Sequence, residues 1–152
     1  MRHQFDKKLR KFRDLGGTAE LAAAIERVVA DRGATFDECA APALCHNDLY
    51  EGNVLVVGDG DDWDVGGIVD VENAIAADPL LDLAKTDYYS IHRDPAKLAG
   101  LADGYGSSLV DHEERMRVYR LYHALELWDW FSLVGQREHL SGIADDIVQL
   151  TR

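Results

Sequence analysis

Two apolar runs near the middle of the chain are bordered by oxygen-bearing polar side chains. Asp48 precedes the run NVLVV, which begins with Asn53, and Asp70 lies in the second run, GGIVDV. The linking segment GDGDDWD is rich in Gly and Asp, and this order of strand, turn and strand predicts a β-hairpin. Because the first strand of a hairpin begins beside the end of the second, we expect Asn53 and Asp70 to be spatial neighbours.

An amide oxygen and a carboxylate oxygen at one place suit Mg²⁺, which binds one or two protein oxygens and keeps several of its waters. Asp48 lies five residues before Asn53, and we expect it near the ion, where it could orient a hydroxyl group and accept its proton. A base Asp with an Asn and a second Asp on the metal is the arrangement used in phosphoryl transfer. The alternative is that the three side chains only cap turns and strand ends.

Other polar residues of this region have less specific interpretations. We expect His46 to be structural, because a His beside a buried strand is more often a hydrogen-bonded core residue than a ligand. With Asp48 and Asp70 it could instead form a transition-metal site, but no second His stands at ligand spacing. The GDGDD turn lacks the ligand spacing and distal Glu of an EF-hand loop, so a solvated turn is expected. Asp78 is expected to cap a helix rather than to bind a metal.

Helical periodicity and capping residues dominate the sequence outside this hairpin. Phe5, Leu9 and Phe12 fall on one face of a predicted helix. Asp78 and Asp94 each precede a Pro, a pattern typical of helix starts. The predicted fold is therefore mainly α-helical with one small β-hairpin (α+β). The predicted helices span residues 4–15, 18–33, 78–92, 94–106, 111–134 and 137–150.

The 152 residues are 47% hydrophobic and carry a net charge of −12, which suits one domain with a buried core. Residues 37–82 contain 12 Asp and Glu and no Lys or Arg, so this segment repels nucleic acid and favours a divalent cation or a cationic small molecule. No apolar run reaches the roughly 18 residues of a membrane span, and the charged N-terminus lacks a signal segment. With only two cysteines, we expect a reduced, cytoplasmic protein.

The segments HNDLYEGNVLV and GGIVDVENAIAADPLLDLAK together resemble the catalytic and metal-binding loops of the aminoglycoside phosphotransferase and choline kinase family, relatives of the protein kinases. Members typically show His-Gly-Asp-x4-Asn, an apolar strand, Ile-Asp-aromatic and then Asp-Pro-x-x-Asp-Leu-Ala. The match covers about Cys45 to Lys85. Asn47 stands where the family has Gly, and Asn tolerates a left-handed backbone better than most residues. Val71 stands where an aromatic residue is common.

The resemblance implies a role for each matching residue. Asp48 would be the catalytic base, and Asn53 and Asp70 would bind Mg²⁺ and, through it, the ATP that donates the phosphoryl group. His46 would support the loop, and Asp82, in the Asp-Leu-Ala element, would hold the loop through its backbone N–H groups. The implied activity is an ATP-dependent phosphotransferase acting on a hydroxyl group of a small molecule, such as an aminoglycoside or an amino alcohol.

The resemblance also implies an N-terminal β-lobe with a phosphate-covering loop and a Lys–Glu pair. Two predicted helices precede His46 instead, and they resemble the beginning of a C-terminal lobe. We therefore expect residues 1–152 to form a single C-terminal lobe, with the N-terminal lobe absent and little or no turnover alone. A nucleotide, a small-molecule acceptor and a separately supplied N-terminal lobe are the expected partners. The alternative is a non-catalytic binding or regulatory module derived from such a kinase.

The longest predicted helix, residues 111–134, carries aromatic residues and acids whose roles differ. Glu126 and Asp129 are expected either on a solvated face or, in the phosphotransferase interpretation, as contacts for a cationic acceptor. The aromatic residues are expected in the helix core; they are Tyr119, Tyr122, Trp130 and Phe131.

Overall fold

A computed structural model shows two compact units in the chain. Unit 1 combines Met1–Ala40 with His112–Arg152, and unit 2 is Ala41–Asp111. The structure describes residues 1–39, 41–91, 94–106 and 109–152. These residues are mainly helical and include two antiparallel sheets of two strands each. The predicted mainly helical class is confirmed, and a second small sheet accompanies the predicted hairpin.

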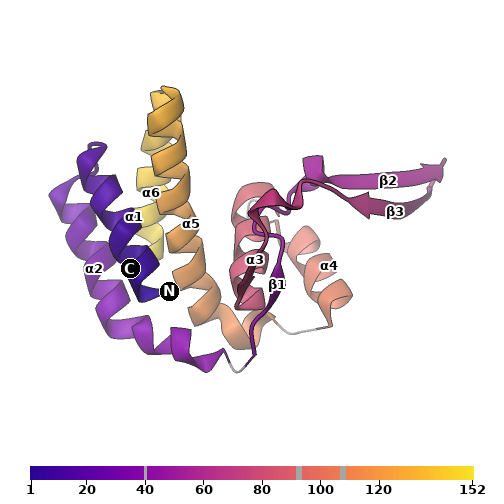
Figure 1. Ribbon diagram of the computed structural model, residues 1–152, viewed down its shortest axis with the longest axis horizontal. Coiled ribbons are helices and arrows are strands. Elements are labelled where there is room, and N and C mark those ends of the chain that lie inside the picture. Colours follow the sequence, from indigo (N-terminus) through magenta and orange to yellow (C-terminus); the bar gives the residue numbers. More distant parts are fainter. Residues whose placement is uncertain (40, 92–93, 107–108) are drawn as a thin grey trace. The chain divides into compact units, whose positions relative to one another are not determined.

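Unit 1 is helical throughout its described residues, and its helices pack against one another (Figure 1). Each of its α-helices lies within a few residues of a predicted one. Short 3₁₀ turns lie beside them at Gly33–Glu38 and Arg137–His139, and a third, Leu109–His112, spans the point in the sequence where unit 2 ends and unit 1 resumes. The α-helices are α1 (Arg2–Asp14), α2 (Ala19–Arg32), α5 (Glu113–Val134) and α6 (Leu140–Leu150).

Aromatic side chains form much of the core of unit 1. Phe5, Leu9 and Phe12 of α1 are all buried, which confirms the predicted face. The ring of Phe5 lies 5.3 Å from that of Tyr122, and the ring of Phe12 lies 4.7 Å from that of Trp128, measured between centroids. Contacts of this kind add to the free energy of burying the rings. The N-terminal helix is therefore an integral part of the unit 1 core.

One prediction about this core was wrong. Tyr119 and Tyr122 are buried as expected, but Trp130 is 53% exposed, and Phe131 is only partly buried. At this end of α5, the face turned toward α1 carries Trp128, whose ring packs on Phe12. Trp130, two residues later, lies about 200° further round the helix and so cannot share that face.

Unit 2 combines two helices with two sheets. The helices are α3 (Pro79–Thr86), continued by a π-helical turn at Asp87–Ile91, and α4 (Pro95–Tyr105). The first sheet pairs β1 (Ala43–Cys45) with β4 (Ile75–Ala77), and the second pairs β2 (Val54–Asp59) with β3 (Asp62–Ile68). The pairing of β1 with β4 was not predicted, because strands of three residues carry too little alternation to be recognised.

Both Asp-Pro pairs begin helices as predicted. The Asp78 carboxylate accepts a hydrogen bond from the N–H of Leu80 at 3.0 Å, and the Asp94 carboxylate accepts one from the N–H of Ala96 at 2.9 Å. Each bond satisfies a backbone donor that the first turn of a helix leaves without a partner. His92, the last residue of one predicted helix, lies outside the described residues.

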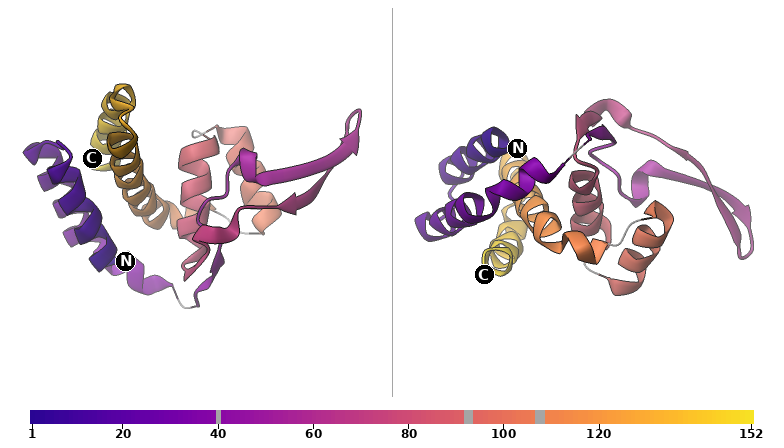
Figure 2. Two further views of the ribbon diagram at one scale, coloured as in Figure 1. Left: turned by 45° about the horizontal axis from the view of Figure 1, so that its top comes forward. Right: turned by 90° about the horizontal axis from the view of Figure 1, so that it is seen from below.

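The predicted hairpin is confirmed. Its strands pair from Val54 opposite Ile68 to Asp59 opposite Asp62, with a bulge at Leu55/Val56. Gly60 in the connecting turn has a φ of +64°, which Gly adopts without steric cost. In both views of Figure 2, the hairpin extends away from α3 and α4 of the same unit. Most of its side chains are exposed.

No helix among the described residues is both long enough and apolar enough to cross a membrane.

Candidate functional site

Four of the predicted site residues lie on or beside the strands of unit 2. His46 and Asp48 follow β1 directly. Asn53 ends the 3₁₀ turn Glu51–Asn53, which leads into β2, and Asp70 comes shortly after β3. The loop from His46 to Asn53 and the end of β3 therefore form one local structure.

Asp82, in the first turn of α3, binds the backbone of this loop. Its Oδ2 accepts a hydrogen bond from the N–H of His46 and its Oδ1 accepts one from the N–H of Asn47, both at 2.8 Å. Asn47 has the left-handed backbone expected for it, with φ at +60°. One carboxylate thus holds two consecutive N–H groups on either side of an unusual backbone conformation.

Two more residues of α3 contact the same loop, and sequence reasoning missed both. Lys85 Nζ donates a hydrogen bond to the carbonyl oxygen of Asn47 at 2.6 Å, and the Thr86 hydroxyl donates one to the carbonyl oxygen of Leu49 at 2.9 Å. Lys85 and Thr86 stand three and four residues after Asp82, the spacing that places side chains on one helix face. This spacing could have predicted that Lys85 and Thr86 face the same loop as Asp82.

The side chain of Asn53 is buried and held in one orientation. It is 5% exposed, and its Nδ2 donates to the carbonyl oxygen of Asp48 at 2.9 Å. Because the nitrogen of the amide is used in this bond, its Oδ1 points elsewhere, and this oxygen accepts no hydrogen bond from the part of the chain that the structure describes. The backbone oxygen of Asn53 accepts from the N–H of Val69 at 3.0 Å, which brings the end of β3 beside it.

Asp70 is exposed and follows that strand end. Its backbone is left-handed, with φ at +63°, and its carboxylate forms no ion pair or hydrogen bond with other described residues. His46 connects the loop to the same place, because its Nε2 donates to the carbonyl oxygen of Val69 at 2.9 Å. The Nδ1 of His46 is buried without a partner among the described atoms.

The carboxylate of Asp48 faces a buried cation. Lys85 is 9% exposed, and its Nζ lies 3.4 Å from Asp48 Oδ1. The same ammonium group lies 5.1 Å from the centre of the Tyr89 ring. On α4, burial and then the negative charges of Cys45, Asp82 and Asp78 raise the pKa of the Tyr105 hydroxyl. The neighbourhood of α3 is therefore acidic, with Lys85 as a cation in contact with the loop.

The donor set fits a hydrated hard cation better than a transition metal. No group of three or more His, Cys, Asp or Glu side chains in the described ranges is arranged to hold a metal ion. Two groups at adjoining strand ends, Asn53 Oδ1 and the Asp70 carboxylate, accept no hydrogen bond from a described residue. Mg²⁺ takes few protein oxygens and retains waters, so these two residues could hold it.

The remaining acids near the hairpin have structural roles or none that the structure reveals. Asp78 caps α3 as described above. The acids at the tip of the hairpin are exposed, as expected for solvated side chains; they are Asp59 at the end of β2, Asp61 in the turn, and Asp62 and Asp64 in β3.

Glu126 and Asp129 belong to unit 1, where both face lysines of α1. Asp129 Oδ2 accepts from Lys11 Nζ at 2.7 Å and lies 3.6 Å from Lys8 Nζ. Glu126 Oε1 lies 3.3 Å from Lys8 Nζ, and its Oε2 accepts from His123 Nδ1 at 2.9 Å. Charges on the protein already pair with both carboxylates, and a role in binding an acceptor stays a prediction.

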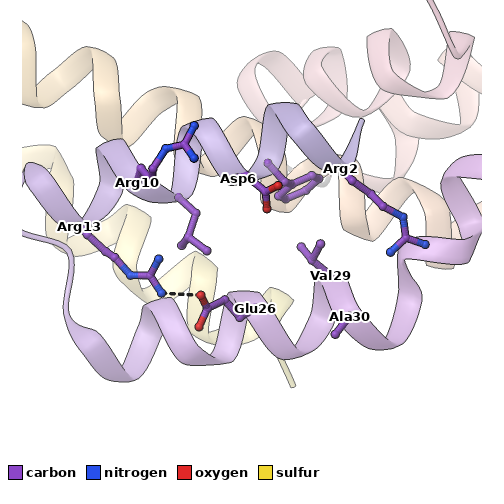
Figure 3. Close-up of a pocket in the computed structure, with 9 residues that line it drawn as sticks. Arg2, Asp6, Arg10, Arg13, Glu26, Val29 and Ala30 are labelled. Carbon is purple, nitrogen blue, oxygen red and sulfur yellow. Dashed lines mark hydrogen bonds and ion pairs between the residues drawn. The ribbon is translucent and has the colours of Figure 1, made fainter.

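Unit 1 also has a groove of about 420 Å³ between α1 and α2. Figure 3 shows Arg2 and Arg13 extending from α1 toward α2, with Arg13 hydrogen-bonded to Glu26 of α2 at 2.6 Å. None of the predicted site residues lines this groove.

Comparison with protein families gives one clear result. Residues 2–119 match the phosphotransferase enzyme family, and because this is most of the chain, the protein belongs to that family. No curated protein and no solved structure shows significant similarity to the chain. The resemblance found in the sequence is thereby confirmed at the level of the family.

Family membership implies a protein-kinase-like fold and a reaction between a nucleotide and a second substrate. Members typically use ATP and Mg²⁺. The acceptor and the roles of individual residues do not follow from membership, so the roles predicted for Asp48, Asn53 and Asp70 stay predictions.

Proposed function

We propose that this chain provides the catalytic lobe of an ATP-dependent phosphotransferase whose acceptor is a hydroxyl group of a small molecule. The observation that best supports this is a set of open oxygens on neighbouring segments. Asp48 Oδ2, Asn53 Oδ1 and the Asp70 carboxylate accept no hydrogen bond from other described residues, although several backbone groups around them are hydrogen-bonded. Buried polar groups normally find partners, so the open oxygen of the buried Asn53 is suited to an ion, and the solvent-accessible carboxylates of Asp48 and Asp70 can be reached by an ion or a substrate.

Asp48 is the proposed catalytic base. Its side chain is 29% exposed, so it is open to a substrate while the loop that carries it is fixed by Asp82 and Thr86 of α3. In this role it aligns the hydroxyl group of the acceptor and takes up the proton that the hydroxyl loses. Fixing the base in advance lowers the entropic cost of reaching the reactive geometry.

Asn53 and Asp70 are the proposed ligands of Mg²⁺. When bound, the ion neutralises the charge that develops on the phosphoryl group during transfer. Asn53 presents its amide oxygen because its Nδ2 is held by the carbonyl oxygen of Asp48. The hydrogen bond from Val69 to Asn53 keeps the two ligand-bearing segments together, and His46 supports the same junction.

The acceptor is proposed to carry positive charge, as an aminosugar or an amino alcohol does. Residues 37–82 supply 12 acidic side chains and no Lys or Arg, which favours a cationic ligand. If Glu126 and Asp129 take part, the acceptor must compete with Lys8 and Lys11 for their carboxylates.

Efficient turnover is proposed to need a phosphate-covering β-lobe, because a triphosphate beside several carboxylates requires cationic help. The same shortage of cations in residues 37–82 supports the second candidate function, a binding or regulatory module that has kept the loop without catalysis. Release of ADP with a panel of hydroxyl acceptors, measured on the chain joined to such a β-lobe, distinguishes the two, since a binding module releases none.

Isothermal titration of Mg²⁺ and ATP into the 152-residue chain tests the metal ligands. Asp70→Asn keeps the size of the side chain and its tolerance of a left-handed backbone but removes the charge, and we expect binding to weaken at least about tenfold. Asp61→Asn, in the exposed turn, makes the same change in net charge and is expected to bind as the unaltered chain does. Equal binding by both variants would remove Asp70 from the metal site.

A further inference from the structure

Lys85 is a buried cation directed at the loop rather than at solvent. It sits on the face of α3 that carries Asp82 and Thr86, and only 9% of it is exposed. Residues 37–82 contain no Lys or Arg, so Lys85 is the first cation of the chain after Arg32. Neither the sequence pattern nor the family resemblance predicted a role for Lys85.

Burying an ammonium group is costly unless charge and hydrogen bonds compensate it. Three groups of the described structure do so for Lys85: the carbonyl oxygen of Asn47 at 2.6 Å, the Asp48 carboxylate at 3.4 Å, and the ring of Tyr89 at 5.1 Å. Two of the three belong to the loop that carries the proposed base. The lysine therefore contacts both the backbone just before Asp48 and the Asp48 side chain itself.

The two oxygens of Asp48 are placed in different surroundings as a result. Oδ1 faces the ammonium group of Lys85, whereas Oδ2 accepts no hydrogen bond from the other described residues. A carboxylate held through one oxygen cannot rotate freely about its χ2 angle, which is otherwise a broad torsion. The second oxygen is then kept in a constant position, as a proton acceptor in catalysis requires.

We propose that Lys85 is a positioning residue for Asp48, orienting the carboxylate through Oδ1 so that Oδ2 faces the hydroxyl group of the acceptor. This inference rests on the proposed function, in which Asp48 is the base. The competing explanation is purely structural: Lys85 would only hold the loop through the carbonyl oxygen of Asn47, as Thr86 holds it through that of Leu49.

Thr86→Val separates the two explanations. It removes a hydrogen bond to the same loop from the same helix face but leaves the charge beside Asp48 in place. Lys85→Met removes the charge and keeps an unbranched side chain of similar length. Lys85→Arg keeps the positive charge and serves as the conservative variant.

The first measurement is steady-state kinetics of phosphoryl transfer by the chain joined to a phosphate-covering β-lobe, which efficient turnover is proposed to need. Lys85→Met is expected to lower kcat about 100-fold, the effect of a misplaced reactive group, with little change in KM for the acceptor. Lys85→Arg should recover part of this loss, and Thr86→Val, which removes one bond to the loop but leaves the charge beside Asp48, should lower kcat much less than Lys85→Met does. If Asp48→Asn abolishes turnover but Lys85→Met leaves kcat unchanged, the inference about Lys85 is overturned while the proposed function stands. Undiminished turnover in Asp48→Asn would instead reject the proposed function.

The second measurement needs no turnover. In the 152-residue chain with ¹³C-labelled Asp, the side-chain carboxyl resonance of Asp48 is assigned by its loss in Asp48→Asn. We expect this resonance to move in Lys85→Met, to return toward its original position in Lys85→Arg, and to stay in place in Thr86→Val. A resonance that is the same with and without the lysine would show that Lys85 does not orient the carboxylate.

Discussion

The two units of this protein use the same kinds of charged side chain in opposite ways. In unit 1, Asp129 is buried and bonded to Lys11 of another helix, 118 residues away in sequence. In unit 2, the Asp70 carboxylate has no partner among the described residues, although the loop beside it is densely hydrogen-bonded. Paired acids stabilise a fold, whereas an acid held beside a rigid loop without a partner is available for chemistry.

Asp48→Asn should give the largest effect, because it removes the proposed base while preserving the shape of the side chain. We expect turnover of the chain joined to a phosphate-covering β-lobe, measured as release of ADP with a responsive acceptor, to fall about 1,000-fold, within the usual contribution of a general base. Asp61→Asn is the matched control in the exposed turn. Full activity of the Asp48 variant would reject it as the base and remove the main functional difference between the two units.

Asp82→Ala should give the largest loss of stability in unit 2. It leaves the N–H groups of His46 and Asn47 without their shared acceptor, and hydrogen bonds to a charged group are worth about 1.5–3 kcal/mol each. We expect the free energy of unfolding, measured with urea, to fall by about 3 kcal/mol. Asp103→Ala, an exposed acid on α4, should change it little. Equal stability of the two variants would mean that Asp82 does not stabilise the loop.

The ion pair of unit 1 should have a smaller effect. A double-mutant cycle of Asp129→Ala with Lys11→Met is expected to give a coupling of about 1 kcal/mol, because Lys11 is partly exposed and solvent screens the pair. The cycle is measured by urea unfolding. An absence of coupling, together with weaker binding of a cationic acceptor in Asp129→Ala, would mean that Asp129 serves ligand binding rather than stability.

The smallest effect is expected at alkaline pH. Burial and then the charge and hydrogen bond of Glu126 raise the pKa of the Tyr122 hydroxyl well above its usual value of about 10. The folded state therefore favours the protonated phenol, so this contribution is complete below pH 10 and is lost as the pH rises above it. Unfolding free energies between pH 8 and about 11 should decline less steeply in Tyr122→Phe than in the unaltered chain. Parallel declines would exclude Tyr122 as the cause.

Elements encoded by neighbouring residues could be predicted closely. The apolar spacing of Phe5, Leu9 and Phe12 requires only the geometry of one helix, and the caps at Asp78 and Asp94 act within their own first turns. The hairpin could be predicted equally well, because its two apolar runs and the Gly-containing turn between them lie within one short segment.

Interactions between segments distant in sequence could not be predicted in this way. The sheet formed by β1 and β4 joins strands of three residues each, and nothing in either strand specifies the other. The exposure of Trp130 depends on which face of α5 meets α1. Both are decided by packing between elements, which overrides local pattern.

The sequence by itself determined the helices, the hairpin and the order of polar residues that marks the phosphotransferase family, because each is written in a few consecutive positions. Only the tertiary structure decided that Lys85 meets Asp48 while Lys11 meets Asp129, and which oxygens are left open. The physical reason is that the interaction energy between two charges depends on the distance between them. Folding of the chain, and not spacing in the sequence, sets that distance.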